Sequence, residues 1–203
     1  FEDVPVMPVA GEAGTVCIVH YDLLHGATPN VADMGRYMVK LLFTRMDEPE
    51  TASWDHDGAQ WEADGDPQDR TWEHLWHWHG GANGSKLEPT LSVSELAPIL
   101  SGDAEPAAVD AAYQLGYSGE AAVPVLIDAL RGDSVAAATN AGYGFTVMGA
   151  AAVEALVEAS KDDDADIRAR AVDALGDMGA NASDAIPALV ERLGDESEIV
   201  RRH

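Results

Sequence analysis

The sequence predicts a mixed fold in which short β-strands precede a stack of α-helical hairpins. Residues 1–46 are rich in valine, isoleucine, threonine, tyrosine and methionine, and glycine, proline and asparagine punctuate them, which is typical of short strands joined by turns. Residues 93–203 are rich in alanine, leucine, valine and acidic residues at helical spacing, and they repeat. Residues 47–92 hold all five tryptophans in a polar stretch, so we expect an irregular bridge there.

Composition excludes several classes of protein. The 203 residues suffice for one large or two small domains. They include 36 acidic and 12 basic residues, a formal charge of -24, and such a chain is repelled by nucleic acid and by anionic membranes. No apolar stretch is long enough to span a bilayer. The single cysteine, Cys17, cannot form an internal disulfide and indicates a reducing, cytoplasmic location.

The helical part repeats with a period near 30. Gly119, Gly149 and Gly179 are spaced by 30 residues, and each closes one helical pattern and opens the next. The segment 122–130 recurs as 185–193, and 151–157 is a weaker middle copy without proline. Second helices are expected at 107–115, 136–148 and 166–175. Two helices per period indicate stacked hairpins, each of which buries its apolar side against the next.

These units resemble HEAT-like repeats, especially the short bacterial type. The matching features are an early proline in the first helix, the acidic turn at 161–164, and an arginine shortly after the start of the second helix, at Arg168 and Arg201. The middle copy has Thr139 roughly where the arginine belongs, and Gly142 and Gly144 interrupt it, so we expect it to be less regular. Such a resemblance implies a fold but no chemistry.

The first zone carries the residues that suggest an enzyme. Strands are expected at 15–21, 23–26 and 36–45, and residues 14–30 read GTVCIVHYDLLHGATPN. A strand, a tight turn, a His-Gly pair at His25 and an arginine eleven residues later, Arg36, resemble the carboxyl-terminal half of the phytanoyl-CoA dioxygenase family. That resemblance implies a double-stranded β-helix, or jelly-roll, that uses Fe(II) and 2-oxoglutarate. It makes His25 the distal iron ligand and Arg36 the residue that binds the far carboxylate of 2-oxoglutarate.

The residue types fit these roles. A neutral imidazole suits Fe(II), and a guanidinium can hold a carboxylate with two hydrogen bonds. In that family a His-x-Asp motif supplies the other two ligands, and it is expected before Phe1, which makes the chain a fragment. The local His20-Tyr21-Asp22 is rejected as that pair, because it lies on the same stretch as His25, whereas a facial site needs ligands from different strands.

The segment 72–80 holds a second group of residues that bind metals in other proteins. His74, His77, His79 and Glu73 can in principle surround zinc, since histidines three residues apart share a helical face. The spacing matches no zinc motif, and no cysteine accompanies it. We therefore expect Trp72, with Trp76 and Trp54, to anchor the segment, and the histidines to be solvated or hydrogen-bonded.

Two functions follow. The first is a fragment of an Fe(II)- and 2-oxoglutarate-dependent dioxygenase that hydroxylates a small-molecule substrate, with the fragment alone inactive because it lacks the proximal ligands. The alternative is a non-catalytic scaffold whose HEAT-like repeats bind a protein partner on their concave surface. An upstream His-x-Asp motif is required by the first and not by the second.

Overall fold

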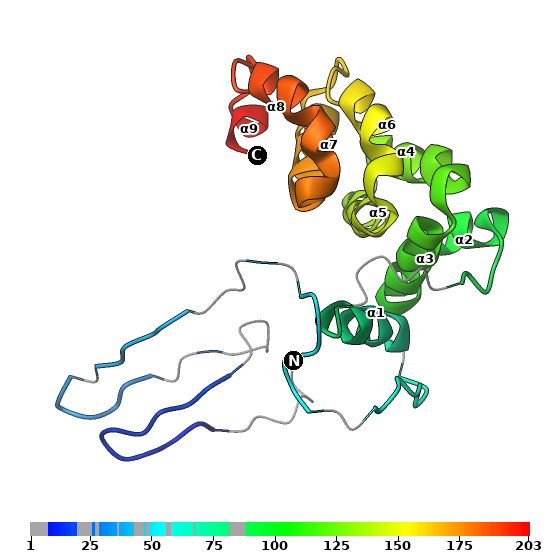
Figure 1. Cartoon of the computed structure of the whole chain (residues 1–203). Helices are drawn as coiled ribbons and strands as arrows, with labels where there is room; N and C mark the ends of the chain where they lie inside the picture. Colours follow the sequence, from blue (N-terminus) through cyan, green and yellow to red (C-terminus); the bar gives the residue numbers. More distant parts are fainter. Residues whose placement is uncertain are drawn as a thin grey trace. The chain divides into compact units, whose positions relative to one another are not determined.

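The computed structural model describes residues 8–19, 26, 29–35, 37–42, 47, 49–55, 58–66, 68–81 and 88–203. The chain divides into two compact units, Phe1–Thr44 and Arg45–His203. All helices of the described part belong to the second unit (Figure 1). None of them is both long enough and apolar enough to cross a membrane.

Helical hairpins make up most of the second unit. Helix α1 spans Asp69–His79 and precedes them. The first helices of successive hairpins are α2 (Val93–Leu100), α4 (Val123–Arg131), α6 (Val153–Ala159) and α8 (Ile186–Arg192). The second helices are α3 (Glu105–Tyr117), α5 (Val135–Met148), α7 (Ala165–Asp177) and α9 (Glu198–Arg202). Short 3-10 helices, η1 (Gly119–Ala122), η2 (Gly149–Ala152) and η3 (Gly179–Ala185), join one hairpin to the next. We number the hairpins one to four, from α2–α3 to α8–α9.

Local sequence signals set the ends of these helices. Gly119, Gly149 and Gly179 have φ values of 66°, 68° and 54°, a left-handed conformation that glycine adopts without strain, and each begins a 3-10 connection. The side chains of Ser134 and Asp164 accept backbone hydrogen bonds at the starts of α5 and α7. The period of 30 in the glycines therefore fixes where each hairpin passes to the next.

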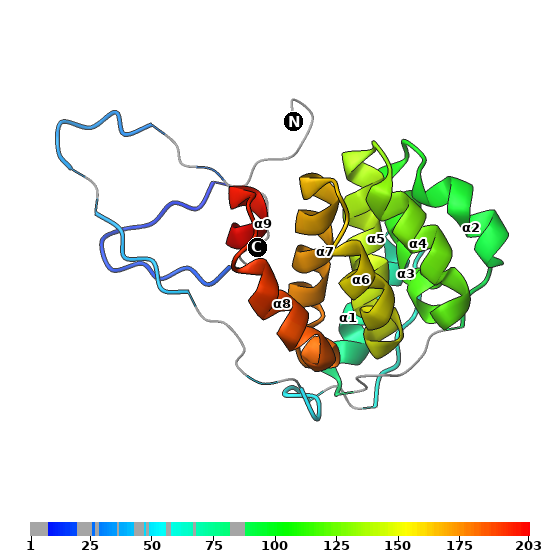
Figure 2. The same ribbon diagram turned by 90° about the horizontal axis from the view of Figure 1, so that it is seen from above.

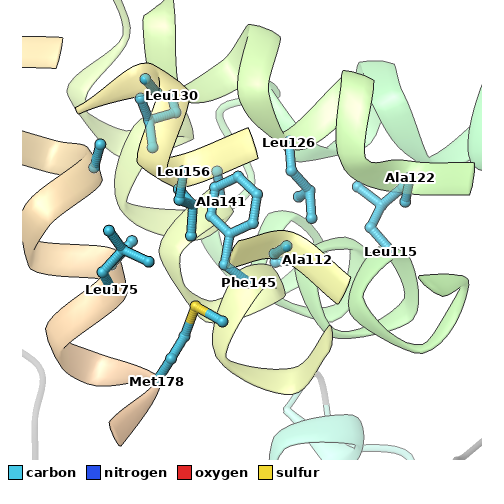
Figure 3. Packing of buried hydrophobic residues seen from close by; sticks show 14 of the residues in the cluster. Ala112, Leu115, Ala122, Leu126, Leu130, Ala141, Phe145, Leu156, Leu175 and Met178 are labelled. Carbon is cyan, nitrogen blue, oxygen red and sulfur yellow. The ribbon is translucent and has the colours of Figure 1, made fainter. Parts of the chain in front are cut away.

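The core repeats with the same period. The residues that precede α3, α5 and α7 are Ala104, Ser134 and Asp164. Seven residues after each of them lies a small apolar side chain, and eleven residues after each lies a large one, all at most 1% exposed. These residues are Ala111, Ala141 and Ala171, followed by Leu115, Phe145 and Leu175. Figure 3 labels Ala141 and the three larger side chains. Leu96, Leu126 and Leu156 of the first helices, also spaced by 30, are fully buried. Each hairpin thus buries an apolar stripe against its neighbours, as expected for stacked repeats.

The hairpins form two rows of helices. In Figures 1 and 2 the helices α2, α4, α6 and α8 make one row, and α3, α5, α7 and α9 make the other, which lies on the inner side of the curve. Helices α3 and α5 approach closely, because a Cβ added at Gly116 would lie 2.7 Å from the carbonyl oxygen of Gly144. Helix α1 contacts α3 at the beginning of the inner row.

An arginine holds the turn inside hairpin three. Arg168 is 6% exposed, and its Nη1 donates to the carbonyl oxygens of Asp162 and Asp163 at 2.9 and 3.0 Å. Its Nε and Nη2 donate to the carboxylate of Asp195, in the next turn, at 2.9 Å each. This pairing lowers the pKa of Asp195 to about 2, chiefly through the hydrogen bonds from Arg168. The acidic turn and the arginine therefore belong to one hydrogen-bonded network that joins two successive turns.

The prediction of jelly-roll strands in the first zone is wrong for the described residues. None of them is in a strand, and residues 15–19 and 37–42 have no helical structure either. Val16, Ile18, Tyr37 and Val39 are 84% to 96% exposed. A strand is stable only when its backbone groups pair with a neighbour, and a β-rich composition does not supply that neighbour.

Three smaller expectations are corrected as well. Cys17, which lies in the strand expected at 15–21, is exposed. The bridge was expected to be irregular, yet it contains helix α1. Gly142 and Gly144 were expected to interrupt the middle repeat, yet α5 is a continuous helix. Gly144 fits there because a Cβ at this residue would lie 2.8 Å from a methyl group of Leu126.

Candidate functional site

The exposed side of helices α3, α5 and α7, here called the inner face, is the candidate site. Its side chains occupy equivalent positions nine and thirteen residues after the residue that precedes each helix. The ninth positions hold Tyr113, Tyr143 and Asp173, and the thirteenth hold Tyr117, Val147 and Asp177. The inner face therefore presents aromatic hydroxyl groups on two helices and carboxylates on the third.

Helical geometry places these residues away from the core. The buried positions lie seven and eleven residues after the same reference, and a step of two residues turns the helix by about 200°. Consequently Tyr143 is 45% exposed, and the side chain of Asp173 is 59% exposed. The side chain of Tyr143 makes no hydrogen bond within the described part of the chain, and neither does that of Asp177.

Helix α1 covers the first tyrosines of the inner face. His74 Nδ1 and Tyr117 Oη lie 2.6 Å apart, and the His74 ring lies 5.1 Å from the ring of Tyr113. Arg70 Nε lies 3.4 Å from Asp110 Oδ1 on α3, and Arg70 Nη1 lies 2.9 Å from Glu73. These contacts fix α1 on α3, so the exposed part of the inner face begins at α5.

Burial favours the neutral forms of the titratable groups between α1 and α3. It lowers the pKa of His74, with a smaller contribution from the nearby His77. It raises the pKa of Tyr113 and of Tyr117, and the neighbouring tyrosine adds to the rise in each case. The neutral His74 ring and the neutral Tyr117 hydroxyl group form a hydrogen bond. This bond stabilises the contact between α1 and α3.

The carboxylates on α7 lie close enough to interact. Partial burial raises the pKa of Asp177, and the charge of Asp173 adds to the rise. Asp173 Oδ1 lies 2.9 Å from His203 Nδ1. Asp177 forms no ion pair with any described residue. Helix α5, beside it, carries no charged residue. The inner face thus joins a neutral surface on α5 to an uncompensated negative charge on α7.

The residues expected to bind iron and 2-oxoglutarate lie outside the described part of the chain. This holds for His25 and Arg36, and for the rejected pair His20 and Asp22. Among the described residues no three histidine, cysteine, aspartate or glutamate side chains are grouped so that they could hold a metal ion. The roles of His25 and Arg36 stay predictions, and we derive no chemistry from them.

One histidine of the histidine-rich segment makes a hydrogen bond, which is one of the two environments expected for these residues. Its first histidine, His74, binds Tyr117, and the aromatic rings pack among themselves. Trp76 contacts Trp54 with ring centroids 5.7 Å apart, and Trp61 at 6.4 Å. Trp72, expected to be an anchor, is 47% exposed.

Sequence reasoning missed the inner face. The signal was present in the spacing, because Tyr113, Tyr143 and Asp173 are separated by 30 residues each, the same period as the glycines. An exposed residue that repeats in step with the core lies on one side of the stack, next to its equivalents.

Comparison with known proteins supports the repeats and nothing else. No curated protein matches the chain. No match supports the dioxygenase resemblance. Residues 123–203, which run from the start of α4 through hairpins two, three and four, match the family model of HEAT repeats.

Proposed function

We propose that the chain is a protein-interaction scaffold, and that a partner protein binds along the inner face. The observation that carries this proposal is the alignment of Tyr143 with Asp173 and Asp177 on neighbouring helices, where all three residues are exposed and lie outside the buried core. Aromatic side chains are enriched where proteins bind one another, since a ring supplies a large contact area and loses little entropy. HEAT repeats commonly mediate such contacts.

The charges favour a partner that presents lysine or arginine. The chain has a formal charge of -24, and Asp177 has no cation beside it among the described residues. A guanidinium can pair with a carboxylate on α7 while it stacks on the ring of Tyr143, which lies on the next helix. Binding would relieve the repulsion between Asp173 and Asp177.

Site-specific crosslinking tests the location of binding. Benzoylphenylalanine placed at Thr139, on the exposed side of α5, is expected to crosslink a specific partner in cells. The same group at Glu154, exposed on α6 in the other row, is the control and should not crosslink that partner. Crosslinks from Glu154 alone, or from neither position, would contradict the proposal.

Matched charge variants test the chemistry once a partner is identified. The variant Asp173→Asn with Asp177→Asn removes two charges from the inner face, and we expect at least a tenfold weaker binding. Asp128→Asn with Glu154→Gln removes two charges from exposed positions of the first helices, and binding should stay within about twofold. Equal losses in both variants would mean that only net charge matters.

A further inference from the structure

An arginine near the end of a first helix joins successive hairpins at two of the three junctions, the places where one hairpin packs on the next. Where hairpin two meets hairpin three, Arg131 Nε lies 3.3 Å from Asp162 Oδ2. Where hairpin three meets hairpin four, Arg192 Nη1 donates to the carbonyl oxygen of Ser160 at 3.3 Å. The same nitrogen lies 3.5 Å from the carboxylate of Asp195.

The junction of hairpins one and two has small residues in place of both arginines. Equivalent positions lie 30 residues apart in hairpins one, two and three, and 33 apart in hairpins three and four, as the starts of the first helices show. The position of Arg131 is therefore held by Ser101 in hairpin one, and the position of Arg192 by Ala129 in hairpin two. Leu100 corresponds to Ser160, and Gly132 corresponds to both aspartates.

A cavity of about 320 Å³ lies where these side chains are missing. Its volume is that of the smaller sites for organic ligands, which begin at about 300 Å³. All four positions that hold the arginines and their partners at the other junctions line it, and so do two carboxylates. These residues are Leu100, Ser101, Ala129 and Gly132, with Asp128 and Asp133.

The groups at the cavity match a guanidinium group. Asp128 and Asp133 are exposed, and neither side chain forms an ion pair or a hydrogen bond with another described residue. No described residue donates a hydrogen bond to the Leu100 carbonyl oxygen, whereas Arg192 binds its equivalent on Ser160. A guanidinium has five donors in one plane and no acceptor, so it can bind a carbonyl oxygen and a carboxylate together.

We propose that this cavity binds an arginine side chain of a protein ligand, which would complete the first junction as Arg131 and Arg192 complete the other two. Free arginine fits less well, because no basic residue lines the cavity to pair with its α-carboxylate. A second copy of the chain is disfavoured by the formal charge of -24. No residue of α3 or α7 lines the cavity. The ligand is therefore separate from the partner of the inner face, and this proposal does not rest on that one.

Titration with short peptides, followed by nuclear magnetic resonance, tests the proposal. We expect acetyl-glycyl-arginyl-glycine amide to shift the amide signals of residues 101 and 132–134. The citrulline peptide has the same shape without the charge and should shift none of them. The lysine peptide should bind at least fivefold more weakly, because an ammonium group lacks the planar fork of donors.

Three results of these titrations would overturn the proposal. Equal binding of the arginine and lysine peptides would mean that charge alone attracts them. Equal shifts at residues 162–164, in the turn of hairpin three, would mean that any acidic turn suffices. Tighter binding of free arginine than of the peptide would exclude a protein as the source of the group.

Variants place the ligand in the cavity. Ser101→Arg with Gly132→Asp rebuilds the pair that Arg131 and Asp162 form, and a Cβ at Gly132 meets no atom closer than 3.4 Å. This filled variant should keep its Tm and lose the peptide shifts. Peptide binding that persists in it would contradict the proposal. So would a dimer of the wild-type chain that the filled variant dissociates, since an arginine of a second copy would then occupy the cavity.

A single carboxylate supplies the matched pair of variants. Asp133→Asn should weaken binding of the arginine peptide about threefold, as expected for one exposed ion pair. Asp163→Asn changes the equivalent exposed residue of hairpin three and should leave binding unchanged. Equal effects of the two substitutions would contradict binding at the first junction.

Discussion

Two junctions between hairpins bind equivalent turn aspartates with different arginines. Where hairpin three meets hairpin four, Arg168 binds two backbone carbonyl groups of its own turn and the carboxylate of Asp195 in the next. Arg192 Nη1 lies farther from the same carboxylate, at 3.5 Å. Where hairpin two meets hairpin three, the position equivalent to Arg168 is Ala138, four residues after Ser134, and it has no such group to offer.

At that second junction one arginine binds the carbonyl groups and another binds the carboxylate. Arg170 Nη1, from α7 of the next hairpin, donates to the carbonyl oxygens of Leu130 and Gly132 at 2.8 and 3.0 Å. Arg131 Nε lies 3.3 Å from Asp162, the equivalent of Asp195. The turn needs its carbonyl groups and its carboxylate bound, whichever residue supplies the nitrogen atoms, so an arginine missing from the repeat pattern does not mean a missing interaction.

Loss of Arg168 should have the largest effect, because this one side chain makes four hydrogen bonds at the junction. Arg168→Met leaves two carbonyl groups without a partner and removes the two shortest side-chain hydrogen bonds of the buried Asp195 carboxylate, and we expect Tm to fall by on the order of 10 °C. Adding Asp195→Leu should recover part of the loss, since no charge is then buried alone. Thermal unfolding followed by circular dichroism measures both. A fall of less than 2 or 3 °C, about that of an exposed ion pair, would contradict this role.

The spacing of the inner helices also differs between neighbours, and two equivalent glycines test it. Gly116→Ala forces a Cβ against the Gly144 carbonyl, so we expect a loss of about 2 kcal/mol in the free energy of unfolding. Gly176→Ala, at the same position of α7, meets no atom within 4 Å and should gain about 0.5 kcal/mol through helix propensity. Urea unfolding gives both values, and equal signs would refute the difference in spacing.

Arg170 should matter less than Arg168, because Arg131 holds the carboxylate independently. Arg170→Ala is expected to cost about 1 kcal/mol and to speed hydrogen exchange near residues 130–134. Ala138→Arg would place an arginine at the position that Arg168 occupies in the next hairpin. If the two junctions are equivalent, it should restore part of the loss in the Arg170→Ala background and bring little to the wild type.

The smallest change expected is a pH effect at the other end of the inner row. Burial lowers the pKa of His74 in the folded chain, so between its ordinary value, about 6.5, and that lower value the unfolded chain binds more protons. The contribution of a neutral His74 to stability is thus present above pH 6.5 and is lost as the pH falls below it. His74→Gln should lose less stability than wild type between pH 8 and pH 5.5, as measured by thermal unfolding. Parallel curves would contradict the expected effect.

The helical stack could be predicted from sequence because its signals are local and repeat. Gly119, Gly149 and Gly179 adopt a left-handed backbone without strain, and the apolar spacing of 107–115 and its copies fits only a helix. That Arg170 binds the turn in place of a residue at position 138 could not be predicted, since its contacts join residues 38 and 40 apart in the chain. The same limit explains the first zone, where β-branched composition suggested strands at 15–21 and 36–45 but could not show that neighbouring strands exist. The inner face lay between these cases, since only its period was visible.

Because Arg170 of hairpin three binds the turn of hairpin two, the two hairpins depend on each other unequally. Removing hairpin three would release the arginine that closes the turn of hairpin two, whereas removing hairpin two would leave Arg168 and Asp195 in place. Under a stretching force applied to the ends of the stack, the second and third hairpins should therefore come apart in order, the third first and the second soon after, and rarely in the reverse order.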